Sequence, residues 1–370
     1  MPAFRSECSR RPAKNPRTTG APHQSAGAGP QSLLVKEANW LGDVVLSLPA
    51  LSAVRRGFPE ARLAVLVRRE LASFFDGASW IDEVIPYTAR GGMGRILGIP
   101  GVVRALRARR FDAAVLFPTS FESALWPGLA GIPRRVGYPG DGRSALLTTR
   151  VDAPPEVARA HEVHWYLHLV ASGLGVAGAA EAVAPDVHAP HRERMATWLA
   201  THRRRPGRVI ALAPGAAYGP AKEWPAAHYA TLVDRLAEAH GAECVLVGAP
   251  SERPRCLEVA ATSRAGALVA AGETSVGELV ALLALADGFA GNDSGAMHVA
   301  GALGRPTVGI FGSTSPERTS PLGPRTRVFY ERIACSPCME RTCRFGHYDC
   351  LRRIAPDDVA AALRDLGALG

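Results

Sequence analysis

Short aliphatic runs alternate with amphipathic stretches through the first half of the chain. Such continuous runs are typical of strands that are buried on both faces of a parallel sheet. They cover residues 32–36, 62–67, 83–86 and 112–117. Helices are expected between them, at residues 44–57, 69–75 and 102–110. This β-α-β-α order predicts a doubly wound parallel sheet.

The same alternation restarts in the second half. Strands are expected at residues 208–213, 243–247, 268–270, 288–291 and 307–311, and helices at 226–240, 252–262, 275–286 and 294–303. The pattern therefore predicts an α/β protein with two Rossmann-like, doubly wound domains that face an interdomain cleft. Because ligands of such sheets bind beyond the carboxyl ends of the strands, functional residues should directly follow strands.

These patterns divide the 370 residues into segments, and two domains of roughly 150 to 180 residues fit that length. We expect a disordered basic tail at 1–30, a first Rossmann-like domain at 31–185, a linker at 186–207, a second domain at 208–354 with a Cys-rich loop at 335–350, and a C-terminal helix at 355–370.

Composition narrows the class of protein. A hydrophobic content of 47% and a charged content of 21% exclude disordered, collagenous and coiled-coil proteins. The longest apolar run, residues 279–286, is far shorter than the roughly 20 residues of a membrane span, so no transmembrane segment is expected. The tail supplies +4 of the net charge of +9, and the mildly basic remainder suits phosphorylated molecules better than nucleic acid. Residues 1–30 contain no apolar segment of the kind that export signals have, so we expect a cytoplasmic protein.

Residues 291–298, with the sequence GNDSGAMH, follow a predicted strand and open a predicted helix. Asp293 is expected to cap this helix. The free backbone N–H groups from Ser294 and Gly295 onward, together with the helix dipole, form an anion site, and His298 lies one turn into the helix. An ordinary helix cap with a packed histidine is the alternative.

The loop at residues 214–225 follows another strand and leads to Lys222. Only three of the 43 basic residues are lysines, which draws attention to this one. A compact ammonium suits the stabilisation of a leaving diphosphate, whereas a solvated surface lysine is the alternative. Trp224 is expected to pack at the start of the next helix.

Asp43 follows the first strand, in the sequence NWLGD. Gly42 permits a tight turn, and the carboxylate of Asp43 then projects into the cleft. The sequence leaves two roles open for Asp43, a general base or a plain helix cap.

Four cysteines cluster late in the chain, at Cys335, Cys338, Cys343 and Cys350. Four thiolates can close a tetrahedral structural zinc site, and free thiols or facultative disulfides are the alternatives. Each of these alternatives is structural, because a site closed by four cysteines has no open position for chemistry.

The chain resembles the heptosyltransferases of glycosyltransferase family nine, most closely the heptosyltransferase II branch. The resemblance runs from about residue 33 to residue 362. It is carried by WLGDVVLSLPAL (40–51), APGAAYGPAKEWP (213–225), AGETSVGEL (271–279) and GNDSGAMHVAGALGRPTVGIFGSTSP (291–316). The other branch has a Thr-Thr pair where this chain has Ala217 and Tyr218.

The resemblance implies a GT-B fold with an N-terminal acceptor domain, a C-terminal domain that binds ADP-heptose, and inversion at the anomeric carbon with no catalytic metal or other cofactor. Asp43 is the implied base, and Lys222 the implied partner of the departing ADP. The implied donor-binding residues are Glu252, which would contact the ribose, Asp293, Ser294, Gly295 and His298.

The implied acceptor is the heptosyl-Kdo-lipid A inner core of lipopolysaccharide, at the cytoplasmic face of the inner membrane, and no nucleic acid is involved. Arginine-rich segments such as Arg134 and Arg135 would meet this anionic acceptor. Two alternatives remain. One is another family-nine transferase or a nucleotide-sugar epimerase on the same fold. The other is a zinc-bearing nucleic-acid-binding protein that uses the tail and the cysteines.

Overall fold

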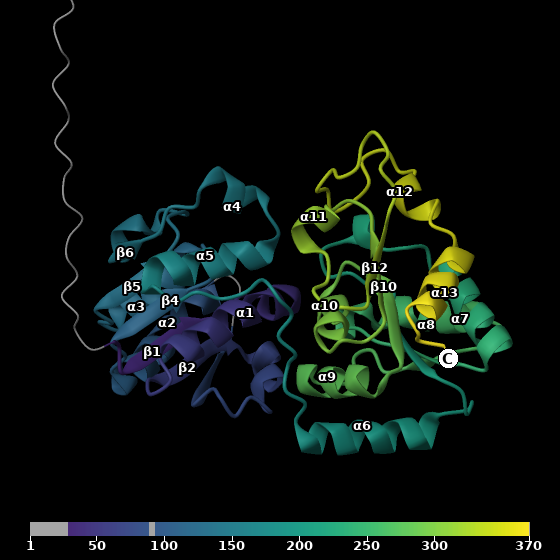
Figure 1. The fold of residues 1–370 in the computed structure, drawn as a ribbon, viewed down its shortest axis with the longest axis horizontal. Coiled ribbons are helices and arrows are strands. Elements are labelled where there is room, and N and C mark those ends of the chain that lie inside the picture. Colours follow the sequence, from purple (N-terminus) through teal and green to yellow (C-terminus); the bar gives the residue numbers. More distant parts are fainter. Residues whose placement is uncertain (1–28, 89–92, 370) are drawn as a thin grey trace, which may run out of the picture.

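The computed structural model describes residues 29–88 and 93–369, and side chains are described from residue 99 onward in the second range. The tail prediction for residues 1–30 lies almost wholly outside this part of the chain. The chain folds into two lobes that lie side by side (Figure 1). Each lobe is built on a six-stranded sheet in which all strands are parallel.

The N-terminal sheet has the strand order β3-β2-β1-β4-β5-β6. Its strands are β1 (Ser32–Lys36), β2 (Arg62–Arg68), β3 (Glu83–Tyr87), β4 (Ala113–Leu116), β5 (Arg134–Gly137) and β6 (Thr149–Arg150). Its helices are α1 (Leu41–Gly57), the 3-10 helix η1 (Arg69–Phe75), α2 (Met93–Arg109), α3 (Phe121–Leu129), the 3-10 helix η2 (Arg143–Leu146), α4 (Pro155–Arg159) and α5 (Glu162–Leu174). The topological switch point lies between β1 and β4.

The C-terminal sheet has the order β12-β11-β10-β7-β8-β9. Its strands are β7 (Val209–Ala213), β8 (Glu243–Leu246), β9 (Leu268–Val269), β10 (Gly288–Asn292), β11 (Thr307–Phe311) and β12 (Thr326–Tyr330). Its helices are η3 (Pro220–Lys222), α7 (Ala226–His240), η4 (Pro250–Glu252), α8 (Arg253–Thr262), α9 (Val276–Leu285), α10 (Gly295–Ala302), α11 (Pro316–Thr319), α12 (Asp349–Arg352) and α13 (Pro356–Asp365).

Both sheets follow the 3-2-1-4-5-6 order of dinucleotide-binding folds, so the prediction of two Rossmann-like domains is confirmed. The second switch point lies between β7 and β10. The segment predicted as a linker contains a helix of its own, α6 (Ala189–His202), which packs against α9 of the C-terminal domain. Segment 69–75, predicted as a helix, is a 3-10 helix.

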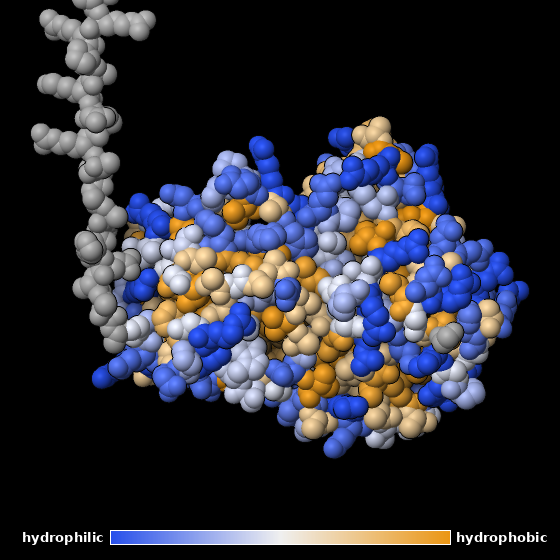
Figure 2. All heavy atoms as spheres, viewed as in Figure 1, coloured by the Kyte–Doolittle hydropathy of each residue, from blue (hydrophilic) through white to orange (hydrophobic). Residues whose placement is uncertain are grey.

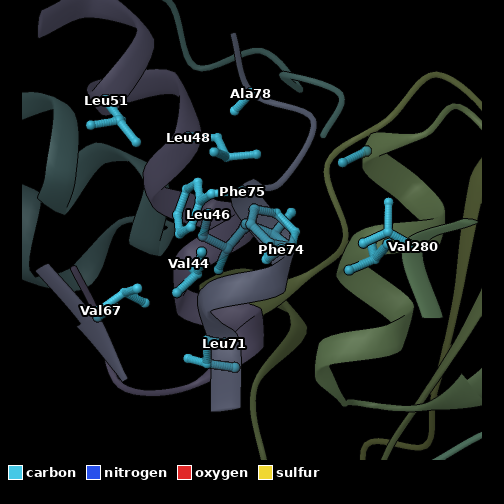
Figure 3. Close-up of a cluster of buried hydrophobic side chains, with 14 of the residues drawn as sticks. Val44, Leu46, Leu48, Leu51, Val67, Leu71, Phe74, Phe75, Ala78 and Val280 are labelled. Carbon is cyan, nitrogen blue, oxygen red and sulfur yellow. The ribbon is translucent and has the colours of Figure 1, made fainter. Parts of the chain in front are cut away.

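An apolar contact joins the two lobes. Helix α1 packs against α10, and η1 packs against α9. A single cluster of buried hydrophobic side chains includes Phe74 and Phe75 of η1 and Val280 of α9 (Figure 3). The backbone N–H of Gly277 also donates to Ser73 Oγ across this contact, at 3.0 Å. The carboxyl ends of the central strands are therefore held facing one another.

Among the described residues, no helix combines the length and the apolar character that a membrane span requires.

Candidate functional site

Helices α1 and α10 meet at their N-terminal ends. A Cβ atom on Gly42 would lie 2.9 Å from His298 Cδ2, and one on Gly295 would lie 2.7 Å from Leu41 Cβ. Only glycine permits so close an approach from both helices. The contact brings Asp43, in the first turn of α1, to the same place as the predicted donor-binding residues of α10.

Asp43 is not the cap of its helix, because α1 begins at Leu41 and Trp40 occupies the N-cap position. The cap interpretation of Asp43 is therefore wrong. Burial and the nearby Glu162 raise the pKa of the Asp43 carboxyl to about 6, against the opposing charges of His298 and Lys222. Such a carboxyl is ionised at neutral pH and more basic than an exposed one, as a general base requires.

A pocket of about 370 Å³ opens beside Asp43. Its walls include Asn39, Trp40, Trp165 and Glu162 of the N-terminal domain and Arg318 of the C-terminal domain. Trp40 is 55% exposed, although large aromatic side chains are usually covered. The pocket therefore combines flat apolar surfaces with polar groups, and both domains contribute to it.

Arg318 crosses from one domain to the other. Its guanidinium forms an ion pair with Glu162 and donates to the backbone carbonyl of Ala158. Figure 2 shows a notch between the lobes at the edge where α4 and α11 face each other. His161 adds a second crossing, since its Nε2 lies 2.8 Å from the carbonyl oxygen of Ser320.

Two buried side chains hold Asn39 at the pocket wall. Its Oδ1 accepts from Lys36 Nζ at 3.3 Å and from the hydroxyl of Tyr87 at 2.9 Å. Burial lowers the pKa of Lys36 to about 7. The sequence motifs did not assign a role to this group, because its members come from different strands and meet only in the folded sheet.

Asp293 is the centre of the C-terminal half of the site. The prediction that Asp293 caps α10 is wrong, because Ser294 takes the N-cap position and Asp293 lies between it and the end of β10 at Asn292. Its Oδ2 instead accepts from Lys222 Nζ at 2.5 Å and from Thr314 Oγ1 at 2.7 Å, and its Oδ1 lies 3.8 Å from His298 Nε2. Burial would raise the pKa of Asp293, but His298 and Lys222 outweigh it and lower that pKa to about 2.

The side chain of Asn292 fixes the loop that carries Lys222. Its amide nitrogen donates to the carbonyl of Pro214 at 2.9 Å, and its Oδ1 accepts from the backbone N–H of Trp224 and from the Tyr229 hydroxyl. Trp224 itself is fully buried, as predicted. Asn292 was part of a recognised motif, but its partners lie in the loop after β7 and in α7, which the motif does not include.

Several polar atoms at the start of α10 are left for a ligand. In the part of the chain that is described, Ser294 Oγ and His298 Nδ1 are buried and have no hydrogen-bond partner. Buried polar groups rarely stay unpaired. The first N–H groups of an α-helix also lack intrahelical partners, and they carry a partial positive charge. The arrangement favours an anionic ligand with several acceptor oxygens.

Glu252 follows β8, near the loop after β7. Its carboxylate accepts from the backbone N–H of Ala249 at 2.6 Å, and burial raises its pKa. A Cβ atom on Gly215 or Gly248 would lie within 3 Å of Glu252. These contacts place Glu252 among the loops that follow β7 and β8, and its contact with a ribose stays a prediction.

The late cysteines surround a small cavity. Cys335, Cys338, Cys343, Cys350 and His347 are among its lining residues, and its volume of about 20 Å³ holds one water molecule or ion. The cysteines of the described chain are free thiols. Burial raises the pKa of the Cys343 thiol, but four backbone N–H groups outweigh burial and lower this pKa, which favours the thiolate. Zinc binding here stays a prediction.

Two facing Rossmann-like domains with charged residues at both switch points are typical of an α/β enzyme that binds its ligand between the domains. The family model of glycosyltransferase family 9 (heptosyltransferase) matches residues 101–349, and the chain belongs to this family. The resemblance found in the sequence is thereby confirmed, and the chain is a glycosyltransferase that transfers heptose.

The chain is also similar to known heptosyltransferases over most of its length. The chain is 31% identical to lipopolysaccharide heptosyltransferase 2 of Escherichia coli over 91% of this chain and 98% of that protein. The solved structure of E. coli ADP-heptose lps heptosyltransferase II has a TM-score of 0.77 at 29% identity and covers 90% of this chain and 98% of that one. A family 9 glycosyl transferase of Veillonella parvula has a TM-score of 0.80 at 22% identity, over 91% and 97%. The predicted GT-B fold is confirmed.

Proposed function

We propose that this enzyme transfers a heptose from ADP-heptose to the heptosyl-Kdo-lipid A inner core of lipopolysaccharide, with inversion at the anomeric carbon. The observation that carries the proposal is the junction of α1 and α10. It sets Asp43, at the wall of the pocket, opposite the Lys222–Asp293 pair and the N-terminal end of α10. The name of the E. coli relative supplies the heptose and the lipopolysaccharide.

Asp43 accepts the proton of an acceptor hydroxyl. The hydroxyl oxygen then forms a bond to the anomeric carbon of the donor, on the face opposite the diphosphate, and the bond from that carbon to the diphosphate oxygen breaks. ADP leaves with the electron pair. A carboxyl with a pKa of about 6 suits this step, because it is ionised at neutral pH yet still takes a proton readily.

The departing diphosphate gains negative charge as this bond breaks. Lys222 supplies a positive charge, and the N–H groups at the start of α10 supply hydrogen-bond donors that are already in place. We therefore propose that the chain performs the step that a metal ion performs in other sugar-nucleotide enzymes, and that catalysis needs no metal. Glu252 would bind the ribose, and His298, Gly295 and Ser294 would shape the donor pocket.

The pocket beside Asp43 suits a saccharide acceptor. Trp40 and Trp165 offer flat apolar faces, and Asn39 and Glu162 offer hydrogen-bonding groups. Arg318 adds a positive charge, which suits an anionic sugar. The predicted contact of Arg134 and Arg135 with the acceptor is not part of the proposal, because both lie on β5 and donate to backbone carbonyls of Gly173 and Leu146. We propose that the enzyme works at the cytoplasmic face of the inner membrane as a peripheral protein.

A panel of donors and acceptors, with mass spectrometry of the products, tests this function. We expect one heptose to be added to a heptosyl-Kdo acceptor, with release of ADP only when that acceptor is present. Release of ADP without acceptor, or conversion of the donor to an epimer, would contradict the proposal.

A further inference from the structure

Two histidines and a carboxylate meet where the two domains are joined. Asp76 directly follows η1 of the N-terminal domain, and His188 and His191 lie at the start of α6. In Figure 1, α6 runs along the edge of the molecule opposite α4 and α11. The proposed transfer chemistry uses none of these residues.

We propose that Asp76, His188 and His191 bind a divalent transition-metal cation, such as zinc, that fastens the interdomain segment to the N-terminal domain. One ligand atom from each residue lies within 4.8 Å of the other two. His191 Nε2 is 2.9 Å from Asp76 Oδ2, and the centroids of the two imidazole rings are 4.9 Å apart. Among the residues that the structure describes, no other group of three or more histidine, cysteine, aspartate or glutamate side chains comes this close together.

His188 supplies an independent indication. Its Nδ1 atom is buried, and within the described chain it has no hydrogen-bond partner. Leaving a buried nitrogen unpaired costs free energy, and this cost would be recovered if the nitrogen bound a cation. His188 and His191 are three residues apart at a helix start, and this spacing places them on one side of α6.

The donor set indicates the kind of cation. Imidazole nitrogen with one carboxylate oxygen is a common ligand set for zinc and for neighbouring transition metals, whereas calcium and magnesium prefer oxygen ligands throughout. Three protein ligands leave a fourth position for water. The Asp76 side chain is 43% exposed, so a cation can reach the site from solvent.

The packing around the cluster indicates what the cation would hold. A Cβ atom on Gly77 would lie 3.0 Å from the carbonyl oxygen of Asp186 and from the backbone nitrogen of His188. The interdomain segment therefore lies directly on the turn after η1. The His191 ring also lies against Gly277, in the first turn of α9, where an added Cβ would be 2.6 Å from it. Both domains and the segment between them meet at this one point.

Titration of the full-length protein with Co²⁺, followed by its absorption spectrum, tests the proposal. Thiolate ligands give Co²⁺ strong charge-transfer absorption in the near ultraviolet, and imidazole and carboxylate ligands do not. The readout therefore separates this site from the cysteine loop. We expect one equivalent of Co²⁺ that lacks the thiolate signature.

That equivalent should bind at least about tenfold more weakly in His188→Ala and in Asp76→Asn, while any thiolate-bound cobalt is unchanged. Asp76→Asn keeps both imidazole rings, so it answers the question if His188→Ala fails to fold. His240→Ala, at the exposed end of α7, is the matched control and should bind as the parent does. Absence of this equivalent in the parent, or its full retention in both variants, would overturn the proposal.

Discussion

Lys222 and Asp293 follow different strands of the C-terminal sheet and form an ion pair, with Nζ 2.5 Å from Oδ2. Thr314 donates to the same carboxylate oxygen, so two hydrogen bonds hold the carboxylate that positions the ammonium. The pKa of Asp293 is about 2, and its carboxylate is therefore charged at any pH at which the enzyme would work. Because that pKa lies below the unfolded value, the pair stabilises the fold above the unfolded pKa. The stabilisation is lost as the pH falls through about 2.

Replacing Lys222 should impair turnover more than donor binding. The ammonium meets charge that grows as the bond to the diphosphate breaks, and an interaction stronger in the transition state lowers the barrier. We expect Lys222→Ala to raise the barrier by about 2 to 4 kcal/mol, by comparison with removal of one preorganised donor. Lys222→Arg should restore activity only in part, because the planar guanidinium does not fit a point-charge site. A loss confined to ADP-heptose affinity, with kcat unchanged, would show that Lys222 only binds the donor and does not stabilise the leaving diphosphate.

Asp293 should act through Lys222. Asp293→Asn removes the charged partner of Lys222, whose side chain is only 14% exposed, so we expect lower thermal stability and lower turnover. The two losses share one interaction, and kcat of the double variant Asp293→Asn, Lys222→Ala should fall little below that of Lys222→Ala alone. Asp152→Asn, an exposed carboxylate, serves as the control. Additive losses in the double variant would show that Asp293 has a separate role.

The cysteine loop should contribute to stability and not to chemistry. If Cys335 and its neighbours bind zinc, a chelator or Cys335→Ser lowers Tm, because the metal binds the folded protein alone. The kcat of the protein that remains folded should be unchanged. Elemental analysis of protein purified under reducing conditions measures the metal directly. Less than a stoichiometric amount would refute the zinc prediction.

Glu162 should tune the pH dependence. Its negative charge helps to raise the pKa of Asp43, so Glu162→Gln should lower that pKa. The base works in its ionised form, and kcat/KM therefore falls as the pH drops through the Asp43 pKa. We expect the acid limb of the profile to move to lower pH in Glu162→Gln and to stay in place in Glu156→Gln, an exposed control on α4. An acid limb that stays in place in Glu162→Gln would show that Glu162 does not raise the pKa of Asp43.

The central strands were predictable from sequence because they are buried on both faces and therefore apolar throughout. β5 begins with Arg134 and Arg135, β6 has only two residues, and β12 is a half-buried edge strand, so none of them shows that pattern. These three strands form because they pair with neighbouring strands of the sheet, and their own sequences do not indicate a strand. Helix α6 escaped prediction because its segment is rich in His, Arg and Pro, and only its packing on α9 gives it a buried face.

The sequence predicted the site residues that lie within a motif, but not the contacts between residues of different motifs. Asp43, Lys222 and Asp293 each follow a strand in a recognisable loop, and the structure brings them to one junction. The cap assigned to Asp293 was wrong, because Lys222 and Thr314 bind its carboxylate from other loops. Arg318 gave no signal in the sequence, since its partner Glu162 lies in the other domain. Pairs of this kind arise only from the docking of the two domains.

The pH dependence of kcat/KM for Asp43→Asn beside the parent enzyme, with a heptosyl-Kdo acceptor, tests whether Asp43 is the base. We expect an acid limb near pH 6 in the parent, from the raised pKa of Asp43. In Asp43→Asn we expect turnover lower by about 100-fold or more, with no such limb. Donor affinity and thermal stability should stay near those of the parent, and Asp141→Asn, an exposed control, should change neither rate nor profile. Near-parental turnover of Asp43→Asn with an unchanged acid limb would show that Asp43 is not the base.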